Sequence, residues 1–149
     1  MIKIGKNISE WSSYSCQPKT KDELKKIIED RIEKEGPNCD LNDIDVSLID
    51  DMSYLFSESE FDGDISDWNV SNVIDMTGMF YKSNFNQPIG EWNVNNVESM
   101  SYMFSESKFN QDISNWKINK ACCVNRMFVE CPIKDEFKPK FNNIFLKFC

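Results

Sequence analysis

The sequence contains no histidine, and this absence excludes much of the common catalytic and metal chemistry. Without His there can be no Ser–His–Asp triad or Cys–His pair, and the commonest zinc ligand is missing. Glycine is scarce as well, and the 5 Gly residues form no loop that could cradle a phosphate group. We therefore predict that the protein is not an enzyme and binds neither a cofactor nor a metal.

The sequence also lacks long apolar segments. No run of apolar residues is long enough to span a membrane, and the N-terminal residues contain no signal-peptide core. These features predict a cytoplasmic protein, with the cell surface as the alternative location.

Basic charge is scarce and unevenly placed. The formal net charge is −8, which is opposite in sign to the surfaces that bind nucleic acids or anionic membranes, so neither is an expected partner. Between Glu35 and Tyr81 the chain has many acids but no Lys or Arg, whereas basic residues outnumber acids from Lys108 onward. Two interpretations remain open: the acids keep the surface soluble, or they steer a basic protein partner to the binding site.

Two clusters have the residue types of a metal site without its spacing. The 6 cysteines include no C-x-x-C pair, so we predict reduced thiols that pack as small apolar groups. A metal site formed by Cys122 or Cys123 with Cys131 is the alternative. Residues 62–67 hold three acids that could bind calcium, but the loop lacks EF-hand spacing, and we interpret it as a polar turn.

What the sequence does contain is a repeat of about 24 residues, the most informative feature of the chain. Full units span residues 46–69, 70–93 and 94–117, and a weaker fourth unit begins at Ile118. Nearly all the matching columns are apolar, and Ser59/Ser83/Ser107 is a polar column. The apolar columns are Val46/Val70/Val94/Ile118, Met52/Met76/Met100/Val124, Phe56/Phe80/Phe104/Phe128, Phe61/Phe85/Phe109/Ile133, Ile65/Ile89/Ile113/Phe137 and Trp68/Trp92/Trp116.

One unit of this length cannot bury its own apolar face, so the repeat predicts stacked units whose equivalent side chains form core ladders. Each unit has room for a short strand, at residues 64–68 in the first, and for a helical turn at residues 52–56. The expected fold is an α/β solenoid with short parallel strands.

Both ends of the repeat region carry helix signals. Thr20 and Glu23 form a capping box, and Gly36 followed by Pro37 is a stop signal, which together predict a helix over residues 21–35. Phe141, Ile144, Phe145 and Phe148 have helical spacing after Pro139 and predict a C-terminal helix, with partner docking as its alternative role. We expect a single domain over residues 1–149: an N-terminal helical cap (1–39), the repeats (40–133) and a C-terminal cap (134–149).

The repeat pattern F-x-x-D-I-S-x-W-N-V-S-N-V-x-x-M-x-x-M-F resembles the BspA-like surface-protein repeat family, which also occurs in mycoplasma lipoproteins. The resemblance covers residues 18–133 and the motif is specific. It implies a leucine-rich-repeat-like, right-handed coil and a role in binding or adhesion, with no catalytic residues to carry over.

Together these features predict a non-enzymatic protein–protein interaction module, in particular an acidic inhibitor or immunity protein that neutralises a basic toxin. The alternative is a surface or secreted adhesin-type repeat protein. Positions that vary between units are free to contact a partner, and Ile74 and Tyr81 interrupt otherwise polar columns. The residues predicted to bind the partner are Asp50, Asp51, Glu58, Glu60, Asp67, Ile74, Asp75, Tyr81, Glu91 and Glu98.

Overall fold

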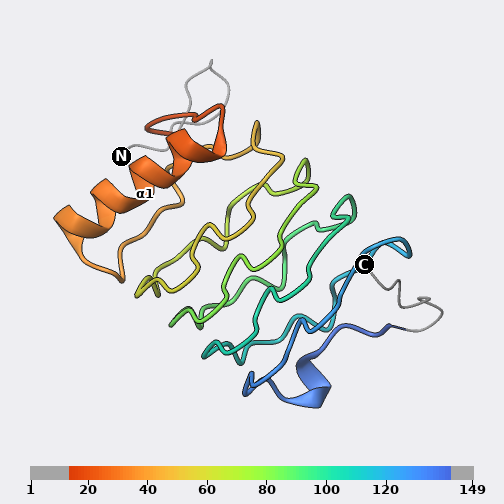
Figure 1. Cartoon of the computed structure of the whole chain (residues 1–149). Helices are drawn as coiled ribbons and strands as arrows, with labels where there is room; N and C mark the ends of the chain where they lie inside the picture. Colours follow the sequence, from red (N-terminus) through yellow and green to blue (C-terminus); the bar gives the residue numbers. More distant parts are fainter. Residues whose placement is uncertain (1–13, 142–149) are drawn as a thin grey trace.

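The computed structural model describes residues 14–141 of the chain. This range contains one α-helix, α1 (Lys21–Glu35), and one short 3-10 helix, η1 (Asp135–Phe137). Figure 1 shows α1 lying across one end of the molecule, followed by repeat units of similar outline that lie side by side. Neither helix in this range has the length and apolar character that a membrane span requires.

The prediction of an α/β solenoid with parallel strands is wrong, and the leucine-rich-repeat comparison fails with it. No strand and no sheet occur in residues 14–141. The units are joined there by isolated parallel bridges, which link Asp51 with Asp75, Asp75 with Ser99, and Ser99 with Cys123, and a similar bridge links Cys16 with Ile44 before the first unit.

Side chains that bind the backbone explain why the expected strand at residues 64–68 does not form. The Ser66 N–H donates to Oδ1 of Asp64 at 2.9 Å, and the Trp68 N–H donates to the carbonyl oxygen of Ile65 at 3.2 Å. Asp and Asn side chains compete in this way with regular backbone pairing and favour turns. The motif D-I-S-x-W therefore forms a turn at residues 66–67 in place of an extended strand.

The expected helical turn at residues 52–56 is a run of tight turns instead. Every second N–H in this run donates to the next unit at 2.8 Å: Met52 to Asp75, Tyr54 to Thr77, Phe56 to Met79 and Glu58 to Tyr81. The intervening N–H groups of Leu55, Ser57 and Ser59 donate to carbonyl oxygens three residues back. Because the same pattern joins the second unit to the third and the third to the fourth, all the units are stacked in one register.

The predicted core ladders are confirmed. Two rows of stacked phenylalanine rings run through the units, with neighbouring centroids in a row between 5.5 and 6.2 Å apart. These rows are Phe56/Phe80/Phe104/Phe128 and Phe61/Phe85/Phe109. All but Phe128, which is partly buried, are fully inside.

The tryptophan column is also buried, and its polar atoms are satisfied inside the stack. Each indole N–H donates to a carbonyl oxygen of the preceding unit, at distances of 2.9, 3.1 and 3.0 Å. The pairs are Trp68 with Leu41, Trp92 with Ile65, and Trp116 with Ile89. The column therefore both fills the core and fixes the register between units.

The predicted N-terminal helix is confirmed with its bounds. Oγ1 of Thr20 accepts a hydrogen bond from the Glu23 N–H at 3.1 Å, and the Gly36 N–H closes the helix on the carbonyl oxygen of Ile32 at 2.8 Å. Leu24 and Ile28 are buried against the first unit. Within the described residues no helix begins at Pro139, and the rest of the predicted C-terminal helix lies outside them.

The cysteines differ in their states. Cys16, Cys39, Cys122 and Cys131 are free, and burial raises the pKa of the Cys122 thiol to about 11, so this thiol is a packing group and not a nucleophile. Cys123 is disulfide-bonded, which contradicts the prediction of reduced thiols at this position.

Candidate binding surface

The tight turns of successive units form one continuous surface. We call the surface made by residues 50–58, 74–82, 98–106 and 122–130 the stacked-turn face. In its first three units every second backbone N–H is used in the bonds between units described above, so contact with another molecule falls mainly to the side chains there. Because equivalent positions lie side by side, this face presents columns of side chains at a constant spacing.

One column of this face holds an unusual backbone conformation. Tyr54, Gly78 and Tyr102 are equivalent residues and have φ values of 56°, 58° and 57°. A left-handed conformation is uncommon for tyrosine, and only glycine adopts it without steric cost. The turn geometry therefore imposes the conformation on all three units, and only the middle unit carries glycine there.

Because Gly78 has no side chain, the Tyr54 ring packs directly against its backbone. A Cβ atom placed on Gly78 would lie 2.3 Å from Cε1 of Tyr54. Beside this contact, Tyr54, Tyr81 and Tyr102 line a hollow of about 250 Å³, which we call the tyrosine hollow. Tyr54 is 49% exposed, so the hollow opens directly to solvent.

Charged groups lie at the edge of the tyrosine hollow. The Tyr81 hydroxyl donates to Oε1 of Glu106 at 3.4 Å, and Nζ of Lys82 is 3.9 Å from Oε2 of the same carboxylate. Nζ of Lys82 also lies 5.2 Å from the centroid of the Tyr81 ring. Its contact with the Tyr81 side chain and the charge of Glu106 raise the pKa of Lys82.

The structure brings several of the predicted partner-binding residues together on the stacked-turn face. Asp50, Ile74 and Glu98 are equivalent residues, all exposed, and Ile74 is 44% accessible. Glu58 is exposed on the same face, whereas Tyr81 is partly buried in the tyrosine hollow. Glu60 is exposed just beyond the end of the face.

Asp51 and Asp75 also lie on this face, but their side chains have structural roles. Oδ1 of each accepts a hydrogen bond from the backbone two residues on, Ser53 and Thr77 respectively, both at 2.8 Å. Asp51 is also 3.4 Å from Nζ of Lys21 on helix α1. Burial raises the pKa of Asp51, but its contacts with Ser53 and Lys21 outweigh burial, and the pKa is lowered overall.

The remaining predicted residues, Asp67 and Glu91, lie on another side of the molecule. The Phe56 ring, from the stacked turns, meets the Trp68 ring inside the core at a centroid distance of 5.9 Å. The segments that carry these two rings therefore bound the core from opposite sides. Asp67 and Glu91 are exposed beside the tryptophan column, across the core from the stacked turns that carry Glu58.

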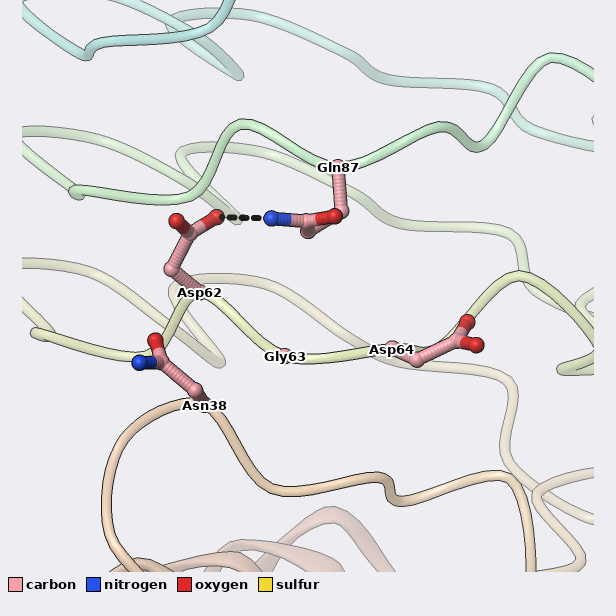
Figure 2. Close-up of a pocket in the computed structure, with 5 residues that line it drawn as sticks. All are labelled: Asn38, Asp62, Gly63, Asp64 and Gln87. Atoms are coloured by element: carbon pink, nitrogen blue, oxygen red, sulfur yellow. Dashed lines mark hydrogen bonds between the residues drawn. The ribbon is translucent and has the colours of Figure 1, made fainter.

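The acidic loop at residues 62–67 is a polar turn, as predicted. Oδ1 of Asp62 accepts hydrogen bonds from the Asn86 N–H at 2.8 Å and from Nε2 of Gln87 at 3.0 Å, while Asp64 binds Ser66. Figure 2 shows the carboxylates of Asp62 and Asp64 pointing in different directions. Among residues 14–141 no group of three or more Cys, Asp or Glu side chains is arranged to hold a metal ion.

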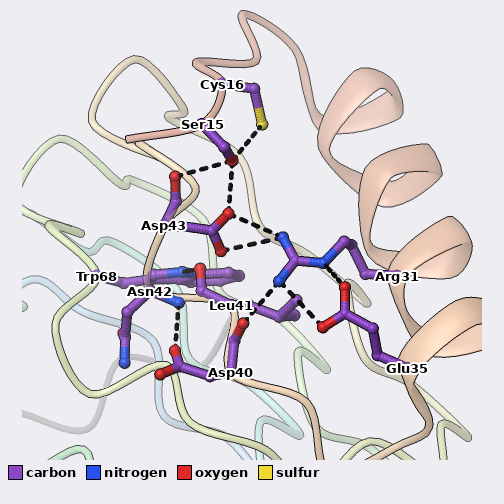
Figure 3. Close-up of polar contacts among 9 residues, drawn as sticks. All are labelled: Ser15, Cys16, Arg31, Glu35, Asp40, Leu41, Asn42, Asp43 and Trp68. Carbon is purple, nitrogen blue, oxygen red and sulfur yellow. Dashed lines mark hydrogen bonds and ion pairs between the residues drawn. The ribbon is translucent and has the colours of Figure 1, made fainter. Parts of the chain in front are cut away.

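A second polar cluster joins helix α1 to residues 40–43, directly before the first full unit. Nη1 of Arg31 lies 3.0 Å from both carboxylate oxygens of Asp43, Nε lies 2.6 Å from Glu35, and Nη2 donates to the carbonyl oxygen of Asp40 at 2.9 Å (Figure 3). Ser15 adds a hydroxyl bond to Asp43 at 2.6 Å. The guanidinium is thus fully engaged within the protein, and we assign this cluster to folding.

Sequence reasoning found Tyr81 but missed the rest of the tyrosine hollow. A signal was present: the Tyr54/Gly78/Tyr102 column varies between units, and it alternates two large rings with the smallest residue. The hollow itself depends on the left-handed conformation of this column, which the residue types alone do not indicate.

Comparison with known proteins found that the chain matches one family profile. The profile described as "Mycoplasma protein of unknown function, DUF285" matches residues 23–142, which include most of helix α1 and all the repeat units. No curated protein and no solved structure matched the chain.

Proposed function

The chain belongs to the family of Mycoplasma proteins of unknown function called DUF285, and from that premise we propose that it is a non-enzymatic module that binds a basic protein partner on its stacked-turn face. The observation that carries this proposal is the tyrosine hollow. Tyrosine rings are enriched at binding hot spots because they bury much area and lose little side-chain entropy. Here three of them meet on a surface whose backbone is already held by bonds between units.

Charge supports a basic partner. Asp50, Glu58 and Glu98 are exposed on the stacked-turn face, and no ion pair is found for them in the described part of the chain. Complementary charge of this kind raises association rates more than it raises affinity. An inhibitor or immunity protein that neutralises a basic toxin would use such a surface.

The proposal is tested by capturing partners from the source cells with a triple variant, Asp50→Asn, Glu58→Gln and Glu98→Gln. A matched control, Glu29→Gln, Asp67→Asn and Glu91→Gln, removes the same charge from exposed positions elsewhere. We expect the wild type and the control to capture the same basic protein at about 50 mM salt, to lose it at about 300 mM salt, and the triple variant to capture much less. Equal capture by all three proteins would contradict the proposal.

A second candidate is binding at the cell surface. The finer resemblance to BspA-like surface repeats favours it. Labelling intact cells with a membrane-impermeant reagent separates the two locations: a labelled chain places the binding outside the cell, and an unlabelled chain places it in the cytoplasm.

A further inference from the structure

The tyrosine hollow has features that define its occupant more narrowly than a basic surface does. Its walls come from three units, with Tyr54 and Tyr102 on either side of the unit that carries Gly78 and Tyr81. The faces of aromatic rings carry negative electrostatic potential and attract cations within about 6 Å of the ring centroid. A hollow lined by three rings therefore offers a cation several such contacts at once.

A cation of the protein itself already contacts this wall. Nζ of Lys82 lies 5.2 Å from the Tyr81 ring centroid and 3.9 Å from Glu106. Ring and carboxylate together thus form an environment that accepts positive charge. Lys82 is exposed, so its ammonium group can move aside into solvent when another cation takes its place.

We infer that the tyrosine hollow receives the guanidinium group of an arginine from the partner protein, with Glu106 as its counter-charge. A guanidinium is planar and weakly hydrated, so it stacks on aromatic rings and leaves water more readily than an ammonium group does. The volume of about 250 Å³ accommodates the group together with the end of its aliphatic stem. This inference rests on the proposed function and names the side chain that the partner inserts.

The test is a titration of the full chain with acetyl-Gly-Arg-Gly-amide, followed by the backbone NMR signals of Tyr54, Gly78 and Tyr102. The matched ligand is the same peptide with citrulline, which keeps the shape of arginine but has no charge. We expect saturable shifts at these residues with the arginine peptide and at least about fivefold weaker binding of the citrulline peptide.

Two variants locate the binding. Tyr54→Leu keeps an apolar side chain but removes one ring, and it is expected to weaken binding of the arginine peptide by about fivefold. Leu48→Ala changes an exposed apolar residue outside the hollow and is expected to leave binding unchanged. Dispersed spectra of both variants would show that each is folded.

Three outcomes overturn the inference: no saturable shift up to about 10 mM peptide, equal binding of the citrulline peptide, or unchanged binding by folded Tyr54→Leu. The capture experiment separates this failure from failure of the proposed function. If charge-dependent capture persists while the peptide test fails, the stacked-turn face binds its partner without an arginine in the hollow. If both fail, the proposed function falls as well.

Discussion

Two positions in each repeat unit hold a left-handed backbone, and their side chains determine what the stacked-turn face presents. The first is the Tyr54/Gly78/Tyr102/Arg126 column, and the second is Glu58/Lys82/Glu106/Glu130, with φ values between 53° and 58°. Such a conformation costs a non-glycine residue about 1–2 kcal/mol. Inter-unit hydrogen bonds offset this cost in the first three units, because each left-handed residue there donates its N–H to the next unit.

Gly78 allows the cost of the left-handed backbone to be measured, because it combines this conformation with a close aromatic contact. Gly78→Ala is expected to lower the free energy of unfolding by about 2–4 kcal/mol, from backbone strain and from overpacking against the Tyr54 ring. In a Tyr54→Ala background the same substitution should cost only the strain, about 1–2 kcal/mol. Urea unfolding of the four proteins in this double-mutant cycle measures the difference.

Lys82→Ala, at the other left-handed position of the same unit, is the control. It replaces one non-glycine residue by another at a φ of 54°, so its backbone strain is unchanged and its stability should stay close to that of the wild type. If the Gly78→Ala cost were the same with and without the Tyr54 ring, the ring would not be packed on Gly78.

At the level of elements, helix α1 is held to the repeat region by apolar packing and by the Arg31–Asp43 pair, whose aspartate lies directly before the first full unit. Burial raises the pKa of Asp43, but its hydrogen bonds with Ser15 and Arg31 outweigh burial, so the pKa is lowered from its ordinary value of 3.8. A carboxylate with a lowered pKa in the folded state stabilises the protein above its unfolded pKa. That stabilisation is lost as the pH falls through the lower, folded pKa.

Asp43→Asn removes both the charge pair and this pH dependence. We expect the variant to be less stable than the wild type by about 1–3 kcal/mol near pH 7, because Arg31 loses its charged partner. The difference should shrink as the pH falls below 3.8, since the wild-type carboxylate then takes up a proton. Denaturant unfolding over a pH series measures it.

Glu35→Gln provides the comparison for this pair. Glu35 also contacts Arg31, but its side chain is 47% exposed, so its loss should cost less than about 1 kcal/mol. Equal losses in the two variants, or a constant Asp43→Asn difference across the pH series, would show that Asp43 does not anchor the helix through its charge.

The elements also show which parts of the fold could be predicted from the sequence. Helix α1 was predicted with its bounds, because a helix is specified by nearby residues: the cap at Thr20, the apolar spacing and the stop at Gly36. The strand at residues 64–68 was predicted wrongly. Its alternating residues fit an extended segment, but Asp64 binds the backbone of Ser66, and that competition depends on side-chain geometry that a pattern does not contain.

For the candidate site too, the sequence pattern did not contain the three-dimensional placement of the side chains. Charge and column variation indicated Asp50, Glu58, Ile74, Tyr81 and Glu98, which the structure places on one face. They also indicated Asp67 and Glu91, which lie on the far side, because a column pattern gives the phase of a residue within the unit but not the side that it faces.

In the whole molecule, one register relates every unit to the next. Bonds that link equivalent positions 24 residues apart recur along the stack: the Asn86 N–H donates to Asp62, the Asn110 N–H to Asn86, and the Lys134 N–H to Asn110. The phenylalanine rows have the same spacing of 24 residues, and the tryptophan bonds, each of which spans 27 residues, recur once in every unit. Stability in such an assembly is approximately a sum over units and their neighbouring contacts.

Removing a whole unit should therefore preserve the architecture, whereas removing half a unit should destroy it. Deletion of residues 70–93 brings the first unit directly against the third, so Met52 can donate to Ser99 as Met76 does in the wild type. We expect cooperative unfolding with a stability loss of about 1–4 kcal/mol, from roughly 0.05–0.15 kcal/mol for each residue removed. Deletion of residues 70–81 shifts the register by half a unit, so Phe56 falls opposite Trp92 and Met52 opposite the exposed Pro88, and it should leave no cooperative transition.

Near-ultraviolet circular dichroism together with thermal unfolding distinguishes the two deletions, because the stacked aromatic rows give a signal only when they are packed. A folded half-unit deletion would mean that the units tolerate a change of register, and the ladder would then not be what specifies the fold. The whole-unit deletion also removes Gly78 and Tyr81, so it should lose the tyrosine hollow while keeping the stack. A folded protein that no longer binds the arginine peptide would thus separate the part of the repeat that makes the fold from the part that makes the site.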